Sequence, residues 1–131
     1  MVIASAWVYV RDRQVLMVRA AGSDAFYLPG GKPEPGETHA EAAAREVREE
    51  VGIVVDPADL TLFTEIVAPA HNRPPGTEVR LICFTGGKTE DEPVAANEIA
   101  ELGWFRSADS ARCAPAIRLL IDELVAVGLI D

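Results

Sequence analysis

The stretch that decides the fold covers residues 31–53 and reads GKPEPGETHAEAAAREVREEVGI. Its first six residues include two prolines, so they cannot form the interior of a helix. Thr38 is a good N-cap residue, and Glu41 three positions later completes a capping box. Gly52 follows the last periodic residue and suits the left-handed position that ends helices. The sequence therefore predicts a loop followed by a helix over residues 38–51.

This helix carries two stripes when it is drawn at about 100° per residue. One stripe is apolar and is expected to pack on a sheet: Ala40, Ala43, Ala44, Val47 and Val51. The other is acidic and consists of Glu46, Glu49 and Glu50, whose spacing makes their side chains neighbours. Arg45 can pair with Glu41 or Glu49 one turn away, but we expect it to point to the side of the acidic stripe.

The acidic stripe has two interpretations. Charged runs on a helix usually face water, so the glutamates can be the solvated face of an amphipathic helix. Alternatively they form a site for a hard cation, because Mg²⁺ and Mn²⁺ prefer carboxylate and carbonyl oxygens. The Gly-Gly turn that precedes the helix would bring carbonyl oxygens close to the same stripe.

The rest of the chain alternates between predicted strands and loops and ends in a second helix. Strands are expected over residues 3–10, 15–18, 60–68, 77–84 and 99–105, with a short extended piece at 25–28. The polar residues 11–14 and the proline-rich residues 69–76 are expected to form hairpin connections, and residues 86–96 an acidic loop. The second helix covers residues 115–127, and it has one apolar face made of Ile117, Leu120, Ile121, Leu124 and Val127.

Length and composition predict one globular domain over residues 1–131. Hydrophobic residues make up 49% of the chain and charged residues 25%, which excludes disordered, collagenous and disulfide-dense classes. No segment has 18 uncharged apolar residues, so no membrane span is expected. Cys83 and Cys113 cannot form a disulfide framework and are expected to be small core residues. A cytoplasmic location is expected.

The charge balance limits the possible partners. The chain has 12 basic and 21 acidic residues and a net charge of −9. A surface of that sign repels phosphate backbones, so binding of bulk nucleic acid is not expected unless metal ions mediate it.

The spacing of residues 31–53 resembles the Nudix box of the Nudix hydrolase superfamily. It has a glycine, five residues, a glutamate and seven residues, and then Arg-Glu-Val, one residue, Glu-Glu, one residue and Gly-Ile, so that every signature position is filled. The lead-in at residues 26–32 and the Trp-Phe ending at 104–105 are similar to small MutT-like domains. The resemblance implies an α+β fold, an α/β/α sandwich with a mixed sheet between helices 38–51 and 115–127.

The resemblance also implies a reaction and a set of ligands. Nudix enzymes hydrolyse the diphosphate linkage of a nucleoside diphosphate joined to another group. By position, Glu46, Glu49 and Glu50 correspond to the catalytic carboxylates that bind Mg²⁺ or Mn²⁺, and the carbonyl of Gly30 to a further ligand. Glu37 and Arg45 correspond to the structural ion pair of the box.

The sequence does not assign the general base, because this residue can be a glutamate of the box or one on a distant loop. Glu98 is the candidate for a distal metal ligand or base and Glu101 is the reserve, while a plain solvated carboxylate is the alternative for Glu98. Base assignment depends first on geometry.

Four residues are candidates for substrate binding. Phe26 and Tyr27 can stack on a base, although core packing is expected for at least one of them. His71 and Arg73 lie in the proline-rich loop, where they can contact substrate or simply be exposed.

The substrate is expected to be a small nucleotide: a nucleoside triphosphate including oxidised forms, ADP-ribose, another sugar nucleotide or a dinucleoside polyphosphate. The short chain favours triphosphates, whereas Pro69 lies where ADP-ribose hydrolases carry a distinguishing proline. The alternatives are a Nudix domain that binds a nucleotide as a sensor without hydrolysing it, and a purely structural acidic helix. A homodimer is one open expectation for the oligomeric state.

Overall fold

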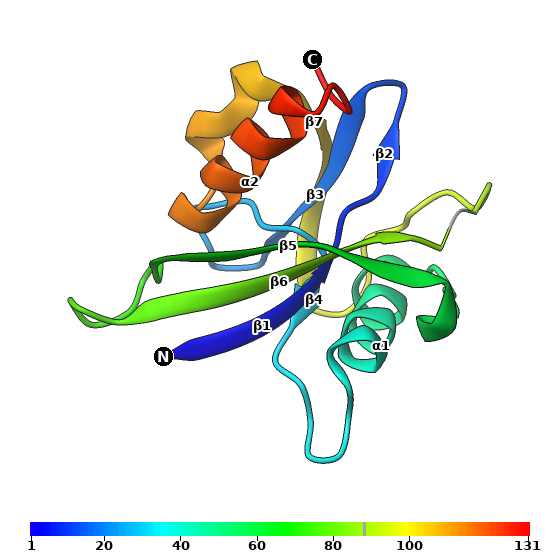
Figure 1. Ribbon diagram of the computed structural model, residues 1–131, viewed down its shortest axis with the longest axis horizontal. Coiled ribbons are helices and arrows are strands. Elements are labelled where there is room, and N and C mark those ends of the chain that lie inside the picture. The colour runs from blue at the N-terminus through cyan, green and yellow to red at the C-terminus, as the bar shows by residue number, and fades with distance from the viewer. Residues whose placement is uncertain (88) are drawn as a thin grey trace.

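The computed structural model describes residues 1–87 and 89–131, which form seven strands and two α-helices (Figure 1). The strands are β1 (Val2–Trp7), β2 (Val10–Arg11), β3 (Gln14–Ala20), β4 (Gly30–Gly31), β5 (Leu60–Pro69), β6 (Glu78–Gly86) and β7 (Ile99–Phe105). The helices are α1 (His39–Val51) and α2 (Pro115–Ala126), with 3₁₀ helices η1 (Pro57–Asp59) and η2 (Ser107–Arg112). The predicted acidic loop is irregular over residues 89–96, and Lys88 lies outside the described residues.

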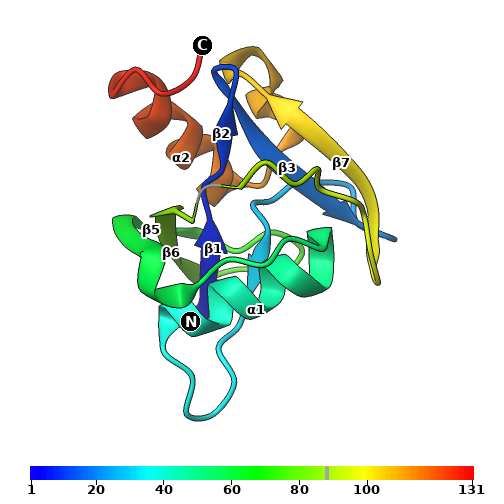
Figure 2. The ribbon, with the colours of Figure 1, turned by 90° about the vertical axis from the view of Figure 1, so that its right-hand side faces the viewer.

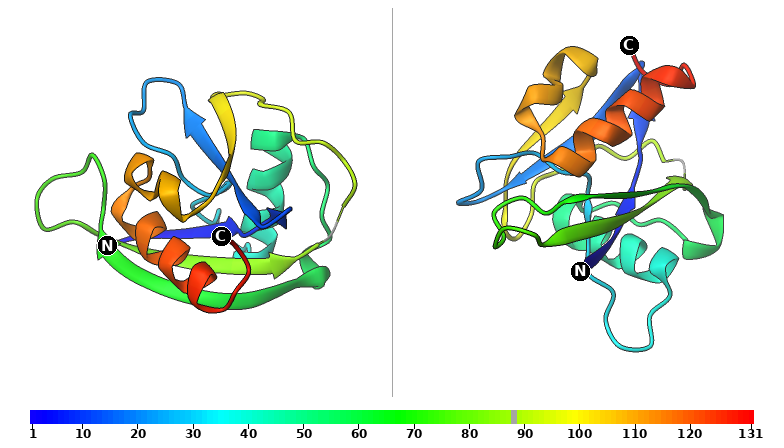
Figure 3. Two further views of the ribbon diagram at one scale, coloured as in Figure 1. Left: turned by 90° about the horizontal axis from the view of Figure 1, so that it is seen from above. Right: turned by 60° about the vertical axis from the view of Figure 1, so that its left-hand side comes forward.

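The strands form two sheets. Four strands in the order β4-β1-β6-β5 make a mixed sheet, in which β1 and β6 are parallel and the other pairs antiparallel. The order β2-β3-β7 makes a smaller antiparallel sheet that runs across the first (Figure 3). The predicted mixed sheet is therefore confirmed, and the second sheet is added to it.

The second sheet exists because the predicted strand over residues 3–10 is two strands. After Trp7 the chain leaves the mixed sheet, and the amide of Val8 still donates to the carbonyl of Phe84 at 2.7 Å. It then joins the other sheet as β2 and turns back through Asp12 and Arg13, which both have positive φ. Two such residues fit the two-residue turn that matches the twist of a hairpin, so the predicted hairpin is confirmed.

The two helices cover opposite faces of the mixed sheet (Figures 1 and 2). Ala43 of α1 packs on Ile82 and Phe84 of β6. Cys83, which points the other way from β6, belongs to the core under α2, together with the predicted apolar face of that helix. The predicted sandwich is thus confirmed. Val127 is the exception on the predicted face, because α2 ends at Ala126 and the Val127 side chain is exposed.

The ends of α1 follow from its sequence. The Thr38 hydroxyl accepts from the amide of Glu41, and the Glu41 carboxylate accepts from the amide of Thr38, which completes the predicted capping box. Gly52 ends the helix in the left-handed conformation, with φ of 72°. Ala43, Ala44, Val47 and Val51 are buried as predicted, and Ala42 is buried with them. The acidic stripe is therefore held beside the apolar stripe, next to the edge strand β4.

Two further predictions concern the cysteines and the membrane. Cys83 and Cys113 are free thiols buried in the core, as predicted, and burial raises the pKa of Cys83 to about 12. Across the described residues, neither helix has the length and apolar character that crossing a lipid bilayer requires.

Candidate active site

A cleft at the C-terminal half of α1 brings four carboxylates together. Glu46, Glu49 and Glu50 line it from the helix, and Glu98 lines it from the segment that leads into β7. Glu49 and Glu98 are exposed, whereas Glu46 and Glu50 are half-buried. The candidate residues that the sequence separates by about 50 positions therefore meet in one place.

Glu50 is the most strongly perturbed of these groups. Its Oε1 accepts from the amide of Gly30 at 3.3 Å. Burial, followed by the neighbouring carboxyl of Glu46, raises its pKa from the usual 4.5 to about 9. Ionising Glu50 at neutral pH is therefore costly unless a positive charge is brought to the cleft.

The two glycines of β4 lie against two of these carboxylates, Gly30 against Glu50 and Gly31 against Glu46. A Cβ on Gly31 would lie 2.6 Å from Cδ of Glu46, so a larger residue would displace that carboxylate. A Cβ on Gly30 would run into the backbone and side chain of Ala6 and the carbonyl of Ser5 on β1. Both positions need glycine because other groups approach closely, and this keeps the carboxylates next to the edge of the sheet.

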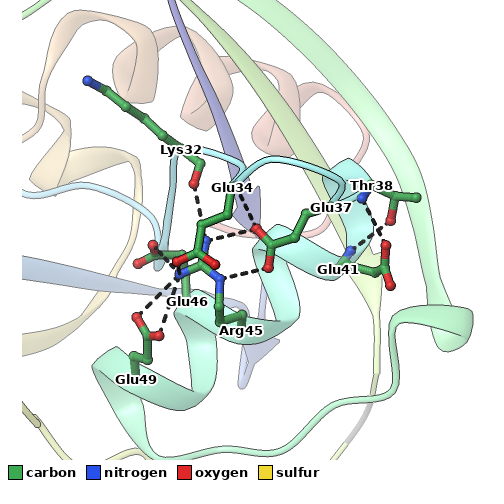
Figure 4. A network of polar contacts seen from close by, with 8 residues as sticks. All are labelled: Lys32, Glu34, Glu37, Thr38, Glu41, Arg45, Glu46 and Glu49. Atoms are coloured by element: carbon green, nitrogen blue, oxygen red, sulfur yellow. Dashed lines mark hydrogen bonds and ion pairs between the residues drawn. The ribbon is translucent and has the colours of Figure 1, made fainter.

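Arg45 is the centre of an ion-pair network at the rim of the cleft (Figure 4). It binds Glu37 with two parallel bonds, from Nε to Oε2 at 2.7 Å and from Nη2 to Oε1 at 3.0 Å. Nη2 also donates to the carbonyl of Lys32 at 3.2 Å. The guanidinium holds the pKa of Glu37 below its usual range. The pair that the sequence predicts thus fastens the loop after β4 to the middle of α1.

The expected direction of Arg45 was wrong. Its Nη1 lies 2.9 Å from Oε1 of Glu46 and 3.4 Å from Oε2 of Glu49, so it lies against the acidic stripe rather than to its side. Glu41 is not its partner, because the capping box engages that carboxylate. The loop around Glu37 draws the guanidinium across the helix and thereby offsets part of the repulsion among the glutamates.

The carboxylate oxygens of the cleft are donors of the chemical type that a hard divalent cation prefers. Within residues 1–87 and 89–131, no three Asp, Glu, His or Cys side chains are already arranged as a metal site. One Glu46 oxygen is held by Arg45. Glu50, by contrast, is a half-buried carboxyl whose ionised form lacks a cationic partner among its hydrogen bonds. Carboxylate oxygens that surround such a group are suitable ligands for Mg²⁺ or Mn²⁺.

Asn97 holds Glu98 at the cleft, which the sequence analysis missed. Its side-chain amide donates to the carbonyl of Glu49 at 2.6 Å, and the amide of Ala96 donates to the carbonyl of Glu50 at 3.0 Å. These carbonyls belong to the last turn of α1, where helices leave acceptors unpaired. Asn97 has φ of 54°, and the tolerance of asparagine for this conformation was the available signal.

Glu101, the reserve candidate, lies apart from the cleft. It stands on β7, where its Oε1 pairs with Nε of Arg19 on β3 at 3.1 Å. Trp104 on the same strand packs beside the Tyr9 ring and beneath the Arg11 guanidinium.

A second hollow of about 300 Å³ lies on the α2 side of β4. Gly30 and Gly31 line it, and they also contact the Glu50 and Glu46 carboxylates. Three of the four candidate substrate-binding residues line it: Tyr27, His71 and Arg73. The fourth, Phe26, is buried against Phe105 at a ring distance of 4.7 Å and lies in the core.

Asp24 fixes the proline-rich loop beside this hollow. Its Oδ1 lies 2.7 Å from Nε2 of His71 and accepts from Nδ2 of Asn72 at 3.2 Å. The contact with His71 holds the pKa of Asp24 below its usual range. The sequence offered no local signal for this contact, because 47 positions separate Asp24 from His71.

Comparisons with known proteins agree with this geometry. A family model of the NUDIX domain matches residues 1–123. The 8-oxo-dGDP phosphatase NUDT18 of Mus musculus is 34% identical over 98 residues, which cover 70% of this chain and 28% of that protein. The chain therefore spans little more than a quarter of the length of that curated relative.

Solved structures match the fold over nearly the whole chain. The MutT protein from Methanosarcina mazei Go1 superposes with a TM-score of 0.75 at 23% identity, over 96% of this chain and 94% of that one. The E. coli dihydroneopterin triphosphate pyrophosphohydrolase superposes with a TM-score of 0.69 at 28% identity, over 96% of each chain. The family match in sequence and the matches to solved structures therefore agree.

Proposed function

Because the chain belongs to the Nudix family, we propose that it hydrolyses the diphosphate linkage of nucleoside diphosphate derivatives, with nucleoside triphosphates as the favoured substrates. One observation carries the proposal. Gly30 and Gly31 line the apolar hollow, and the same two residues lie against carboxylates of the cleft, because Gly30 donates to Glu50 and Gly31 lies beside Glu46. A single substrate that passes over this edge strand can place its phosphates at the carboxylates and its base in the hollow.

The proposed cofactor is Mg²⁺ or Mn²⁺. Glu46, Glu49 and Glu50 would hold it, with the carbonyl of Gly30 as a further ligand. When bound, the cation screens the phosphate charges and lowers the pKa of a bound water. A bound cation would also offset the negative charge at the cleft of a chain whose net charge is −9, which would otherwise repel an anionic substrate.

The side chains of the cleft have distinct proposed roles. Glu98 lies at the exposed side of the cleft, where its carboxylate can take the proton of the attacking water. The water oxygen bonds to phosphorus, and the anhydride bond breaks to release two phosphorylated products. Arg45 is a positioning residue, since it fixes the loop after β4 and holds Glu46 and Glu49 on one side of the helix.

The size of the hollow supports a nucleotide substrate whose nucleoside part lies there. At about 300 Å³ it lies at the lower end of the range for ligand pockets. The mouse relative is named an 8-oxo-dGDP phosphatase, which supports a nucleoside diphosphate derivative as the substrate class.

The test is a nucleotide panel with Mg²⁺ or Mn²⁺, scored for phosphate, pyrophosphate and nucleotide products. Nucleoside triphosphates, ADP-ribose and sugar nucleotides are compared in one series. We expect Glu50→Gln to lose at least about 100-fold in kcat/KM, because it removes a charge needed in the transition state. Glu41→Gln is the matched control: it lies on the same helix, and glutamine also serves at that position of a capping box.

Different outcomes would overturn different parts of the proposed function. Full activity in Glu50→Gln, or full activity in EDTA, would overturn the proposed role of the carboxylates. Tight nucleotide binding with no product in the presence of either cation would favour the sensor alternative.

A further inference from the structure

Residues 89–98, which we call the strap, lead into β7 and end at Glu98 in the carboxylate cleft. The structure describes all of them, and none of their side chains is buried. A segment with few buried apolar contacts opens at a low cost in free energy. The strap therefore depends on a small set of polar contacts for its position.

The second half of the strap closes the C-terminal end of α1. The amide of Val94 donates to the carbonyl of Val51 at 3.0 Å, beside the bonds that strap residues 96 and 97 make to the same helix end. These bonds pair the last carbonyls of α1, which a helix leaves without partners of its own. Glu98 follows directly, so a shift of the strap along the helix end moves this carboxylate relative to the cleft.

The first half of the strap is held by Arg11 of β2, in the second sheet. Its Nη1 pairs with Oε1 of Glu92 at 2.7 Å, and its Nη2 donates to the carbonyl of Asp91 at 3.2 Å. The Tyr9 hydroxyl donates to the carbonyl of Thr89 at 2.7 Å, and it accepts from Nη2 of Arg11 at 2.6 Å. Arg11 and Tyr9 together thus bind three residues of the strap.

The ion pair alone would not make Arg11 important, because pairs between exposed side chains contribute little. The Glu92 side chain is 76% exposed, whereas that of Arg11 is 27% exposed. Arg11 is more buried because its guanidinium lies over the rings of Tyr9 and Trp104, with Cζ at 5.2 Å from each ring centre. Cation–π contacts with two rings hold the guanidinium in one place, and its donors are then directed at the strap.

We propose that Arg11 is a positioning residue for the reaction: it holds the strap against the end of α1, and the strap keeps Glu98 in the carboxylate cleft. The inference rests on the proposed function, in which Glu98 takes the proton of the attacking water. Arg11 is not among the described residues that line the cleft, so it acts through the strap. Loosening the strap therefore lowers kcat, while the proposed metal ligands on α1 stay where they are.

The first experiment is a double-mutant cycle on kcat of the full chain, with saturating Mg²⁺ and the nucleotide that it hydrolyses fastest. Arg11→Met keeps an unbranched apolar side chain over the two rings but removes every donor to the strap. We expect kcat to fall by about 10-fold while KM and Mn²⁺ affinity stay within about 2-fold, because a misplaced catalytic group lowers the rate rather than binding. In a chain that already carries Glu98→Gln, Arg11→Met should have no further effect, since no base remains to be positioned.

Arg13→Met is the matched control. Arg13 lies in the turn of the same hairpin, but it pairs with Asp131 at 2.6 Å, so its loss should leave kcat within about 2-fold. An equal loss of kcat from Arg11→Met with and without Glu98→Gln would overturn the inference, because Arg11 would then act by another route. A kcat of Arg11→Met equal to that of the unaltered chain would also overturn it. Full activity of Glu98→Gln would overturn both the inference and the proposed role of Glu98.

The second experiment follows the strap without substrate. Hydrogen exchange of the Val94 and Ala96 amides reports its opening, because both amides are bonded to α1 carbonyls. We expect Arg11→Met to speed this exchange by about 10-fold, whereas Arg13→Met leaves it unchanged. Equal exchange in Arg11→Met and in the unaltered chain would overturn the inference.

Two further points keep the tests decisive. An unaltered chain that hydrolyses no nucleotide would defeat the proposed function, and the exchange experiment would still show whether Arg11 holds the strap. Arg11→Lys, which keeps a cation over the rings but loses the forked donors, is used if thermal unfolding shows that Arg11→Met does not fold.

Discussion

Removing the charge of Glu50 is expected to stabilise the metal-free protein, although it lowers catalytic activity. The pKa of Glu50 is raised by burial and by Glu46, so the folded state retains a proton that the unfolded state has lost between pH 4.5 and about 9. The unfolding free energy of the metal-free protein therefore falls as pH rises through this window. The variant Glu50→Gln has no charge to bury at this position, so its unfolding free energy does not follow that slope.

The magnitude follows from the width of the window. About 2.5 pH units separate the usual pKa of 4.5 from pH 7, and each unit corresponds to about 1.36 kcal/mol. Glu50→Gln should thus exceed the unaltered chain by roughly 3 kcal/mol at pH 7 in EDTA, and by under about 1 kcal/mol at pH 5. With saturating Mg²⁺ the order should reverse, because a ligand that binds only the folded state stabilises it.

Urea unfolding at pH 5, 7 and 9, in EDTA and in Mg²⁺, measures each of these differences. Glu41→Gln provides the control, since its exposed carboxylate lies outside the cleft. A difference between Glu50→Gln and the unaltered chain that does not change with pH would refute the reasoning. So would a lower stability of Glu50→Gln at pH 9 in EDTA.

Three further substitutions test the surroundings of the cleft. Arg45→Lys loses the two parallel bonds to Glu37, and it is expected to lower the unfolding free energy by about 1–3 kcal/mol in urea titrations, whereas an unchanged midpoint would contradict the network. Gly31→Ala places a methyl group against the Glu46 carboxylate and should weaken Mn²⁺ binding by at least about 10-fold in calorimetry, while the far-ultraviolet circular dichroism stays unaltered. Asn97→Gly keeps the left-handed backbone but removes the side-chain amide, so kcat should fall by about 10-fold or more; a kcat equal to that of the unaltered chain would show that the amide does not position Glu98.

Local chemistry is the reason why much of the fold could be predicted. The ends of α1 at Thr38 and Gly52 could be predicted because helix capping depends on residues that are close in sequence. The break after Trp7 could not be predicted, because residues on both sides of it are apolar and β-branched or aromatic. The change of sheet there depends on the hydrogen bonds of the neighbouring strands, which a local pattern does not contain.

The candidate site also has features that local sequence predicts and features that it does not predict. The spacing of Glu46, Glu49 and Glu50 places them on one face of a helix whatever the rest of the chain does. The direction of Arg45 depends on a loop that returns from β4, and the contact of Asp24 with His71 joins segments that are distant in sequence. Such contacts arise only when the tertiary structure is complete.

The two-glycine strand β4 has a consequence for how this protein can change over evolutionary time. The acids that carry the proposed chemistry stand on one side of it, and the aliphatic walls that would hold the base stand on the other. Mutations that reshape those walls leave the acids where they are, so a lineage can acquire a new substrate without first losing its reaction.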